Sequence, residues 1–432
     1  QDIYLTGNPQ ITFFKVVYRR HTNFSMESIQ QTFNGTPSFG GSTTATISRN
    51  GDLVGKVYVQ FDPSAVFKVN SGSGSADANH VPNGGHALLK EVEIEIGGQR
   101  IDKHYSHWLN AWGTLTGQLG FCKTHTDGKF RVSPLCTGSG AELTPAPTMY
   151  QKMAFCCKDG MASTRNNGTG PGEKFATVPL QFWFCRNPGL ALPLIALQYH
   201  EVKIKVTFPD LSEILSSVTG TTNASLSSVQ MWADYIYLDT DERRRFAQVS
   251  HEYLIEQLQY QSEAAGTNFK LNFNHPVKEL VWAGARGSTV SVHGGPSTPN
   301  SLQTTAGTRL RETDTSTGGT VTLKLNGHER FAPRHDNYFT RTQVWQHHQH
   351  ERGSGADTDQ GDAIHVYSFA LKPEEHQPSG TCNFSRIDSA QLIYSKQVGG
   401  TGTTTQTGLH IWAVNYNVLR IMSGMGGLAY SN

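Results

Sequence analysis

The chain has 432 residues and a mass of 47.4 kDa, and its 36 Lys and Arg against 35 Asp and Glu give a formal net charge of +1. Only 16% of the residues are charged and 10% are aromatic, which excludes a long coiled coil, a highly charged disordered tail and a low-complexity chain. The balanced charge argues against a dedicated nucleic-acid surface, because such domains are usually strongly basic.

A short helix is predicted near the N-terminus. Asn8 is a good N-cap, and Ile11, Phe14 and Tyr18 follow at the spacing that places apolar side chains on one face of a helix. The pattern predicts a helix over about residues 9–19.

Strand signals dominate the rest of the chain. In Glu91–Ile96 apolar residues alternate with glutamates, which predicts a strand with one buried face and one face in water or at an interface. Period-two runs of this kind predict strands at Ser28–Phe33, Leu53–Phe61, Glu91–Ile96, Val202–Phe208, Leu254–Gln261, Phe269–Phe273, Thr320–Leu325 and His410–Val418.

A second helix is predicted after Asp102, which can serve as its N-cap. Tyr105, Trp108, Leu109 and Trp112 would form one apolar stripe along it. Core packing explains such a stripe better than an aromatic binding site does.

An irregular region over about residues 117–176 holds most of the cysteines. The six cysteines of the chain are Cys122, Cys136, Cys156, Cys157, Cys185 and Cys382. No C-x-x-C pair occurs, which excludes zinc-ribbon and thioredoxin-like sites. Cys122 and His125 have a spacing that suits metal ligands, with further cysteines downstream. Reduced, scattered thiols are nevertheless the interpretation that we favour.

The segment DERRRFA, between Thr240 and Gln248, is predicted to be a charged helical connector. Its arginines could contact phosphate, but the acidic residues before them favour a solvated or subunit-pairing face. Long stretches rich in Gly, Ser, Thr and Asn are predicted to be surface loops, because they cannot bury enough apolar area to form a core. These loops span about residues 62–89, 284–319, 351–362 and 397–408.

The two parts of the chain repeat the same order of elements. ESIQQTF, NGDLVGKVYVQF and EVEIEIGGQRI in the first part correspond to IEQLQYQ, FKLNFNHPVKELVW and TLKLNGHERF in the second, and MWADYIYL corresponds to IWAVNYNVL. The repeats span about residues 24–240 and 250–430, each with about eight strands, the content of a jelly roll. The sequence therefore predicts an all-β fold of two tandem jelly rolls with a few short helices.

No motif for catalysis is present. A G-x-S-x-G elbow and a phosphate-binding G-x-x-x-x-G-K-[ST] loop are both lacking. His200 and His251 each begin an H-E-x-x-H pattern, but Ile204 and Ile255 stand where the second zinc ligand would be. The histidines of His347–His350 could bind a metal weakly, but they have no evident distant partner. We predict no catalytic, cofactor-binding or metal-binding residue.

Sequons for N-glycosylation occur at Asn23, Asn34, Asn167, Asn223 and Asn383. Such patterns arise often by chance in a chain rich in Ser and Thr. Asn167 and Asn223 are the better candidates, because they lie in loop-like stretches.

Several longer segments resemble the major capsid protein of large icosahedral double-stranded DNA viruses, most closely those of algal chloroviruses and their phycodnavirus relatives. The sequence departs from the pattern of this family in about residues 109–176, 284–319 and 397–408. The segments that carry it are Gly7–Gly35, Ile47–Leu53, Glu93–Tyr105, Asn187–Lys203, Arg245–Gln259, Leu271–Pro276, His376–Asp388 and Asn415–Tyr430.

The resemblance implies an N-terminal segment at residues 1–23, a first jelly roll at 24–240 and a second at 250–432. Three chains would form a pseudo-hexagonal homotrimer, the capsomer, and many capsomers would tile an icosahedral shell. The implied protein is structural rather than an enzyme, has no cofactor, and is assembled in the host cytoplasm into the outer capsid of the virion. The implied partners are other copies, neighbouring capsomers, minor capsid proteins, the inner viral membrane and the host surface, with no specific nucleic acid.

In relatives from algae, virus-encoded enzymes attach sugars without needing the usual sequon. The resemblance therefore adds Asn300 to Asn167 and Asn223 as a candidate glycosylation site.

Two alternatives remain open from the sequence. A minor capsid paralogue would share most of the same segments, and abundance in purified virions would separate it from a major capsid protein. A carbohydrate-binding β-sandwich adhesin would be equally rich in strands, Gly and Thr, but would not need Gly7–Gly35 or the closing NYNVLRIMSGMGG. A glycoside hydrolase would need two carboxylates about 5–10 Å apart, and none can be nominated.

Overall fold

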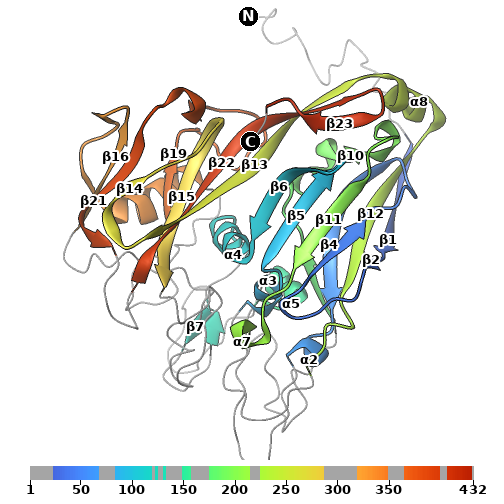
Figure 1. Ribbon diagram of the computed structural model, residues 1–432, viewed down its shortest axis with the longest axis horizontal. Coiled ribbons are helices and arrows are strands. Elements are labelled where there is room, and N and C mark those ends of the chain that lie inside the picture. Colours follow the sequence, from blue (N-terminus) through green and yellow to red (C-terminus); the bar gives the residue numbers. More distant parts are fainter. Residues whose placement is uncertain are drawn as a thin grey trace, which may run out of the picture.

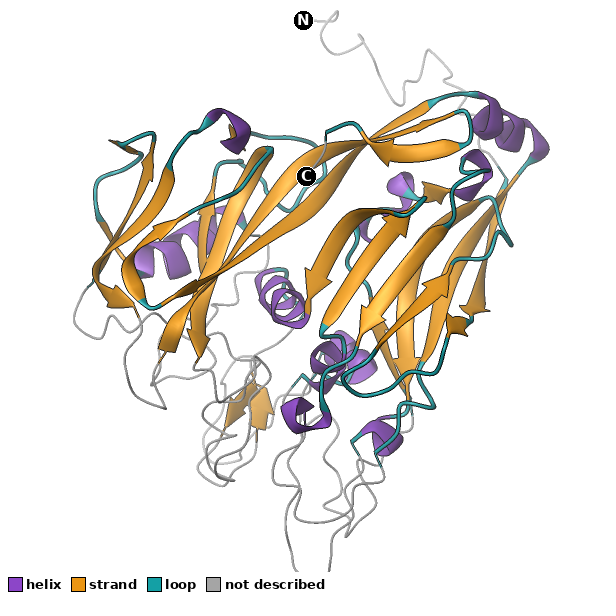
Figure 2. Cartoon of the chain, in the orientation of Figure 1, coloured by secondary structure: helices purple, strands orange, loops and turns teal. Residues whose placement is uncertain are grey.

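The computed structural model of the chain describes residues 23–67, 83–118, 122–124, 130–132, 148–156, 175–214, 224–286, 319–348, 364–398 and 406–430. These residues form two antiparallel β-sandwiches that lie side by side (Figure 1), and only short helices accompany the strands (Figure 2). Among the described helices, none is both long enough and apolar enough to span a membrane.

The first sandwich, called the first half below, consists of two five-stranded sheets. One sheet contains, in spatial order, β1 (Phe24–Gln31), β12 (Gln230–Leu238), β4 (Leu53–Phe61) and β10 (Leu192–Pro193), and β9 (Ala176–Pro179) also pairs with β4. The facing sheet contains β2 (Phe33–Asn34), β3 (Ser42–Thr46), β11 (Val202–Thr207), β5 (Glu91–Ile96) and β6 (Gln99–Tyr105).

The second sandwich, the second half, is built in the same way. One sheet contains β13 (His251–Ala264), β22 (Gln406–Met422), β15 (Pro276–Arg286) and β19 (His365–Ser368), with β20 (Cys382–Asn383) on β15 and β23 (Met425–Leu428) on β22. The facing sheet contains β14 (Gly266–Lys270), β21 (Ala390–Val398), β16 (Thr320–Leu325) and β17 (His328–Glu329), with β18 (Arg334–His335) on β16. A separate ribbon pairs β7 (Cys122–Thr124) with β8 (Phe130–Val132).

The two halves repeat one topology. The order β1-β12-β4 of the first half returns as β13-β22-β15, and β3-β11-β5-β6 returns as β14-β21-β16-β17. Strands in corresponding places also follow one another in the same sequence along the chain. This is the pattern of two jelly rolls in tandem, and the predicted fold class is confirmed.

The helices are short and lie between strands. The α-helices are α2 (Pro63–Val66), α3 (Gly84–Leu88), α4 (Ser106–Leu115), α5 (Met149–Ala154), α6 (Trp183–Arg186), α7 (Leu211–Ile214), α8 (Thr240–Gln248) and α10 (Gln343–His347). A π-helical turn, η3 (Tyr338–Thr342), leads into α10, and 3-10 turns occur at η1 (Pro188–Leu190), η2 (Leu194–Ala196) and η4 (Phe384–Arg386). The charged connector is helical as predicted, whereas the helix predicted over about residues 9–19 lies outside the described residues.

The predicted cap of the second helix is wrong. Asp102 does not cap α4, because β6 continues along β5 as far as Tyr105, which is the N-cap residue instead. The Asp102 carboxylate accepts backbone hydrogen bonds from Lys103 (2.9 Å) and from Leu258 of the second half (3.0 Å).

The alternation in the sequence determines where the cores lie. Val92, Ile94 and Ile96 of β5 are buried in the core of the first half, as their spacing predicts. A separate core fills the second half around Trp282 and Leu392. Each sandwich therefore has its own core.

Tight turns at equivalent places join β5 to β6 and β16 to β17. Gly97 and Gly98 have φ values of 59° and 81°, and Asn326 and Gly327 have φ values of 52° and 80°. Two successive residues in the left-handed region are typical of the two-residue hairpin turn whose twist matches the flanking strands.

We expect Gly97→Ala to destabilise the protein more than Gly98→Ala. An added Cβ at Gly97 would lie 2.3 Å from Nδ1 of His200, whereas one at Gly98 would meet nothing within 4 Å. Both substitutions place alanine in the left-handed region at about 1–2 kcal/mol, and the clash adds about 1–3 kcal/mol at Gly97 alone. Thermal unfolding of the two variants measures the difference, and equal melting temperatures would contradict the expected clash.

Candidate functional site

The candidate site is the seam between the two halves. It consists of three contacts: a strand arm, a helix packed on a sheet, and a group of buried charges. The seam is where the sequence determines how one half sits against the other.

The arm is formed by the ends of β13 and β22, which run past the second half towards the first (Figure 1). Ile255, Leu419 and Ile421 are buried in the core of the first half rather than in that of the second. At the hairpin that follows, the backbone N–H of Leu428 donates to Oε1 of Gln99 on β6, at 3.3 Å. The second half therefore completes the core of the first.

Helix α4 of the first half packs on the outer face of the sheet β13-β22-β15. Trp108 and Trp112 lie one helical turn apart, and with Ala111 and Leu115 they share a buried cluster with Val281, Val366, Trp412 and Val414. The rings of Trp108 and Trp412 lie 5.9 Å apart. The predicted aromatic stripe is core packing, and the core that it joins is shared between the halves.

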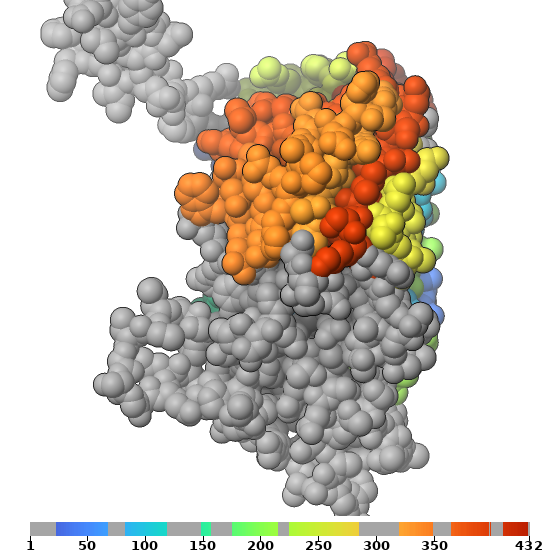
Figure 3. Space-filling view, turned by 90° about the vertical axis from the view of Figure 1, so that its left-hand side faces the viewer, coloured from blue at the N-terminus to red at the C-terminus, as the bar shows by residue number. Residues whose placement is uncertain are grey.

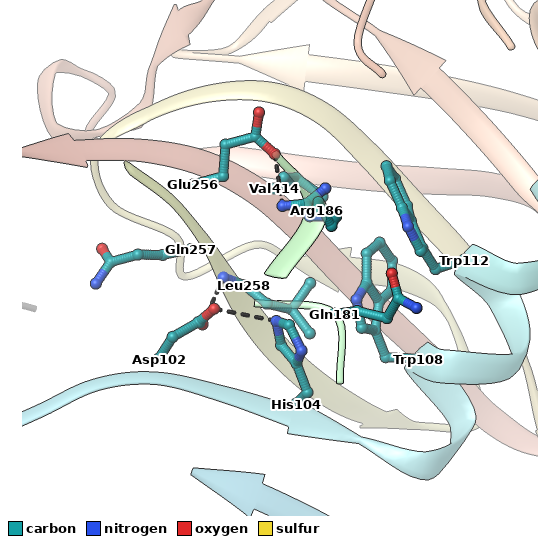
Figure 4. Close-up of a pocket in the computed structure, with 10 residues that line it drawn as sticks. All are labelled: Asp102, His104, Trp108, Trp112, Gln181, Arg186, Glu256, Gln257, Leu258 and Val414. Atoms are coloured by element: carbon teal, nitrogen blue, oxygen red, sulfur yellow. Dashed lines mark hydrogen bonds and ion pairs between the residues drawn. The ribbon is translucent and has the colours of Figure 1, made fainter. Parts of the chain in front are cut away.

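Glu256 of β13 pairs with two cations, one from each half. Figure 4 shows the pair with Arg186 of the first half. Nη2 of Arg186, at the end of α6, is 2.7 Å from one of its oxygens, and Nζ of Lys278 on β15 is 2.9 Å from the other. The side chain of Lys278 is 0% exposed and that of Glu256 is 5% exposed. The Arg186 guanidinium also lies over the ring of Trp112, at 5.1 Å from its centre.

Burial and the neighbouring charges shift the pKa values of Glu256 and Lys278. Burial alone would raise the pKa of Glu256, but Arg186 and Lys278 outweigh it and hold this pKa well below its usual range. Burial lowers the pKa of Lys278, and the nearby Glu256 opposes that change. Removing either cation would leave a carboxylate in the interior without its full compensation.

Below the ion pairs, Asp102 of β6 joins the two halves, because one of its oxygens accepts from the backbone N–H of Leu258 on β13. Its second oxygen lies 3.0 Å from Nε2 of His104, and Gln257 of β13 donates to the carbonyl of Ile101. These side chains, with Trp108 and Arg186, line a small cavity (Figure 4). It has space for about one water molecule, far below the roughly 300 Å³ or more that small-molecule sites occupy.

The histidines of the run His347–His350 do not come together at one site. Nδ1 of His348 lies 2.7 Å from Glu374, and its Nε2 lies 3.4 Å from Glu279. Burial alone would lower the pKa of His348, but the two carboxylates raise it to about 9. His347 instead lies at the exposed end of α10, and His350 is outside the described residues. Across the described part of the chain, no group of three or more His, Cys, Asp or Glu is placed to hold a metal ion.

The candidate glycosylation residues Asn167, Asn223 and Asn300 all lie outside the described residues. Cys156 and Cys185 are buried free thiols, and burial raises the pKa of Cys185 to about 12. Sequence reasoning missed the charges of the seam. Their only local signal is a charged pair, Lys278 and Glu279, inside the apolar run PVKELVWAG.

Comparison with known proteins covers both halves. Residues 12–239 match the family described as the major capsid protein N-terminus, and residues 242–427 match the family described as the large eukaryotic DNA virus major capsid protein. The chain is 49% identical over 448 residues to the major capsid protein of Pyramimonas orientalis virus, covering 100% of this chain and 97% of the relative. It is 40% identical over 477 residues to that of Paramecium bursaria Chlorella virus 1, covering 100% and 97%.

Solved structures agree with these matches. A quasi-atomic model of the PBCV-1 virus capsid superposes with a TM-score of 0.67 at 37% identity, covering 98% of this chain and 100% of that chain. The Faustovirus major capsid protein superposes with a TM-score of 0.63 at 14% identity, covering 96% of this chain and 94% of that one, which shows a shared fold alone.

Lys278→Met should destabilise the protein by about 3–5 kcal/mol, because it removes one of the two cations that compensate the buried carboxylate of Glu256. The matched control is Arg420→Met, whose partner Glu252 is 59% exposed, and it should cost less than about 1 kcal/mol. Chemical denaturation of both variants provides the comparison. Similar costs for the two substitutions would show that the buried pair is not important for stability.

The raised pKa of His348 predicts a loss of stability in mild alkali. A group whose folded pKa, about 9, exceeds its unfolded value of 6.5 contributes stability that is fully present below pH 6.5 and is lost as the pH rises through 9. The full effect amounts to about 3 kcal/mol. The melting temperature of the wild type should therefore fall between these pH values more steeply than that of His348→Gln, and parallel curves would contradict the assignment.

Proposed function

Because the chain belongs to the family of large eukaryotic DNA virus major capsid proteins and forms the capsid shell, we propose that it does so as a homotrimer with a pseudo-hexagonal outline. The protein is structural and is not an enzyme. The matches extend over its full length, which removes the adhesin interpretation.

The observation that carries the proposal is the repeated topology of the two halves. Two similar wedges in one chain become six around a three-fold axis, and a six-sided outline can close-pack a surface. The seam supports this geometry because it holds the two wedges in one relative orientation through a shared core and buried charges. Three such chains would need head-to-tail contacts that close into a ring.

We further assign the two ends of the capsomer to the two faces of the shell. Helix α2, at the start of the 62–89 stretch, lies at the end opposite to α8 and β23 (Figure 1). Arg286 and Gln406 pair where β15 ends and β22 begins, so the loops after 286 and before 406 leave the second half together. Loops of this composition tolerate variation, which suits an outward face that meets the host.

The opposite end would face the interior. On this assignment the N-terminal segment 1–23, α8 and the β22–β23 hairpin face minor capsid proteins and the inner viral membrane. Glycans at Asn167, Asn223 or Asn300 would belong to the outward face. The jelly rolls would correspond to residues 24–240 and 250–432, and free thiols such as Cys156 suit assembly in the host cytoplasm.

Light scattering on a size-exclusion peak should give three times 47.4 kDa. Obligate interfaces commonly bury more than about 2,000 Å², so the monomer should not accumulate at working concentrations. A single peak at the mass of one chain would contradict the trimer.

The matched variants for the two faces are a loop replacement and a terminal deletion. Replacing residues 289–316 with a short Gly-Ser linker should leave trimers intact, whereas deleting residues 1–20 should impair shell assembly. The reverse outcome would contradict the assignment of the faces.

A further inference from the structure

Two tryptophans occupy equivalent strands of the two halves. Trp232 lies on β12 and Trp412 on β22, and each is followed by an alanine. Ala233 and Ala413 are buried in the cores of their own halves. Because successive side chains of a strand point to opposite faces, both tryptophans lie on the outer faces of their sheets.

Trp412 is completely covered within the chain. It stands in a row between Tyr260 of β13 and Val281 of β15, and it is 0% exposed. Its cover comes from α4 of the first half, through Trp108 and through His107, whose ring lies 5.3 Å away. The first half thus places a helix on the outer face of a sheet of the second half.

Trp232 is less completely covered than Trp412, although its indole Nε1 is buried. It stands in the corresponding row between Gln30 of β1 and Tyr58 of β4, and both aromatic residues are only half-buried. On the same face of β1, Phe24 is 64% exposed and Met26 is 58% exposed. This outer face of β1, β12 and β4 lies at the edge of the first half (Figure 1), and it combines these aromatic and apolar side chains with polar ones such as Gln30 and Lys56.

The second half carries a helix in the place that α4 occupies in the first. Helix α4 follows β6, and η3 with α10 follows β17 and β18, the two short strands that pair with β16 directly after it in the chain. Leu109 of α4 and Phe339 of η3 each enter the core of their own half. On α10, Trp345 is 63% exposed.

Much of the segment 320–348, which includes α10, lies on the side of the second half that faces away from the first, while Val344 of α10 joins the buried cluster that α4 shares with the second half. Figure 3 views this side, and residues of the range 320–348 (orange) cover much of it. The two surfaces therefore lie at opposite edges of one chain. That arrangement is required when identical copies join head to tail in a closed ring.

We propose that α10 of one copy packs, through Trp345, on the outer face of β1, β12 and β4 of the next copy, around Trp232. This contact between copies would have the same form as the contact within the chain, in which α4 packs on the sheet around Trp412. It rests on the proposed trimer, and it names the two surfaces that join its members.

A photoreactive benzoylphenylalanine at position 345 tests the contact directly. Irradiation of the full-length trimer should give species of two and three chains on a denaturing gel. Mass spectrometry should place the cross-links on β1, β12 or β4 of a different copy. The same group at Met149, which is 78% exposed on α5, is the control and should not reach those strands.

Trp345→Ser gives the energetic test. Because Trp345 is largely exposed in a single chain, its loss should leave secondary structure unchanged. A buried aromatic anchor at an interface predicts that the midpoint concentration for trimer dissociation rises at least about tenfold, with Met149→Ser as the unaffected control.

The outcomes separate the two proposals. Trimers whose cross-links from position 345 map elsewhere, or trimers that withstand Trp345→Ser, would overturn the contact and leave the trimer standing. A wild-type protein that is monomeric by light scattering would overturn the trimer itself, and the contact with it.

Discussion

A carboxylate that leaves water must be compensated, and Glu256 is compensated from both halves of the chain at once. Arg186 reaches it from the first half and Lys278 from the second, at 2.7 and 2.9 Å. If the halves rotated apart, Glu256 would lose one cation while it remained buried beside the other. The energetic cost of that separation holds the two sandwiches in one orientation, and the orientation determines the outline of the subunit.

The apolar contacts of the seam reinforce the same orientation. The ends of β13 and β22 bury Ile255 and Ile421 in the core of the first half, and α4 buries Trp108 against the second. Each half therefore lacks part of its cover without the other. The two jelly rolls repeat one topology, but they are not independent folding units joined by a linker.

Sequence alone predicts what is decided locally. The bounds of β4, β5 and β16 follow from alternation, because both faces of each strand are set within its own sandwich. β13 and β22 extend at both ends beyond the predicted Leu254–Gln261 and His410–Val418, since the extra residues pair with each other along the arm at one end and around Ala264 and Gly408 at the other. β1 begins at Phe24 rather than at Ser28, because Phe24–Glu27 also pair with β12, at Tyr235–Leu238.

The seam itself could not be predicted, since its partners are distant in sequence. Glu256 and Arg186 are 70 positions apart, and Asp102 accepts from Leu258 across 156 positions. Asp102 looks like a helix cap when only its neighbours are considered. The aromatic stripe of α4 was correctly assigned to a core, but nothing in its spacing indicates that the core belongs to both halves.

The two kinds of contact in the proposed ring differ in what they must overcome. Within the chain, α8 already holds the halves close, so the seam does not have to offset the translational entropy of association. Buried ion pairs can therefore fix the relative orientation of the halves in the seam, even though desolvation largely cancels their attraction. Between copies, association costs several kcal/mol before any stability is gained. The contact between copies should accordingly rely on apolar area, and Trp345, Phe24 and Met26 are exposed in the single chain as such a contact requires.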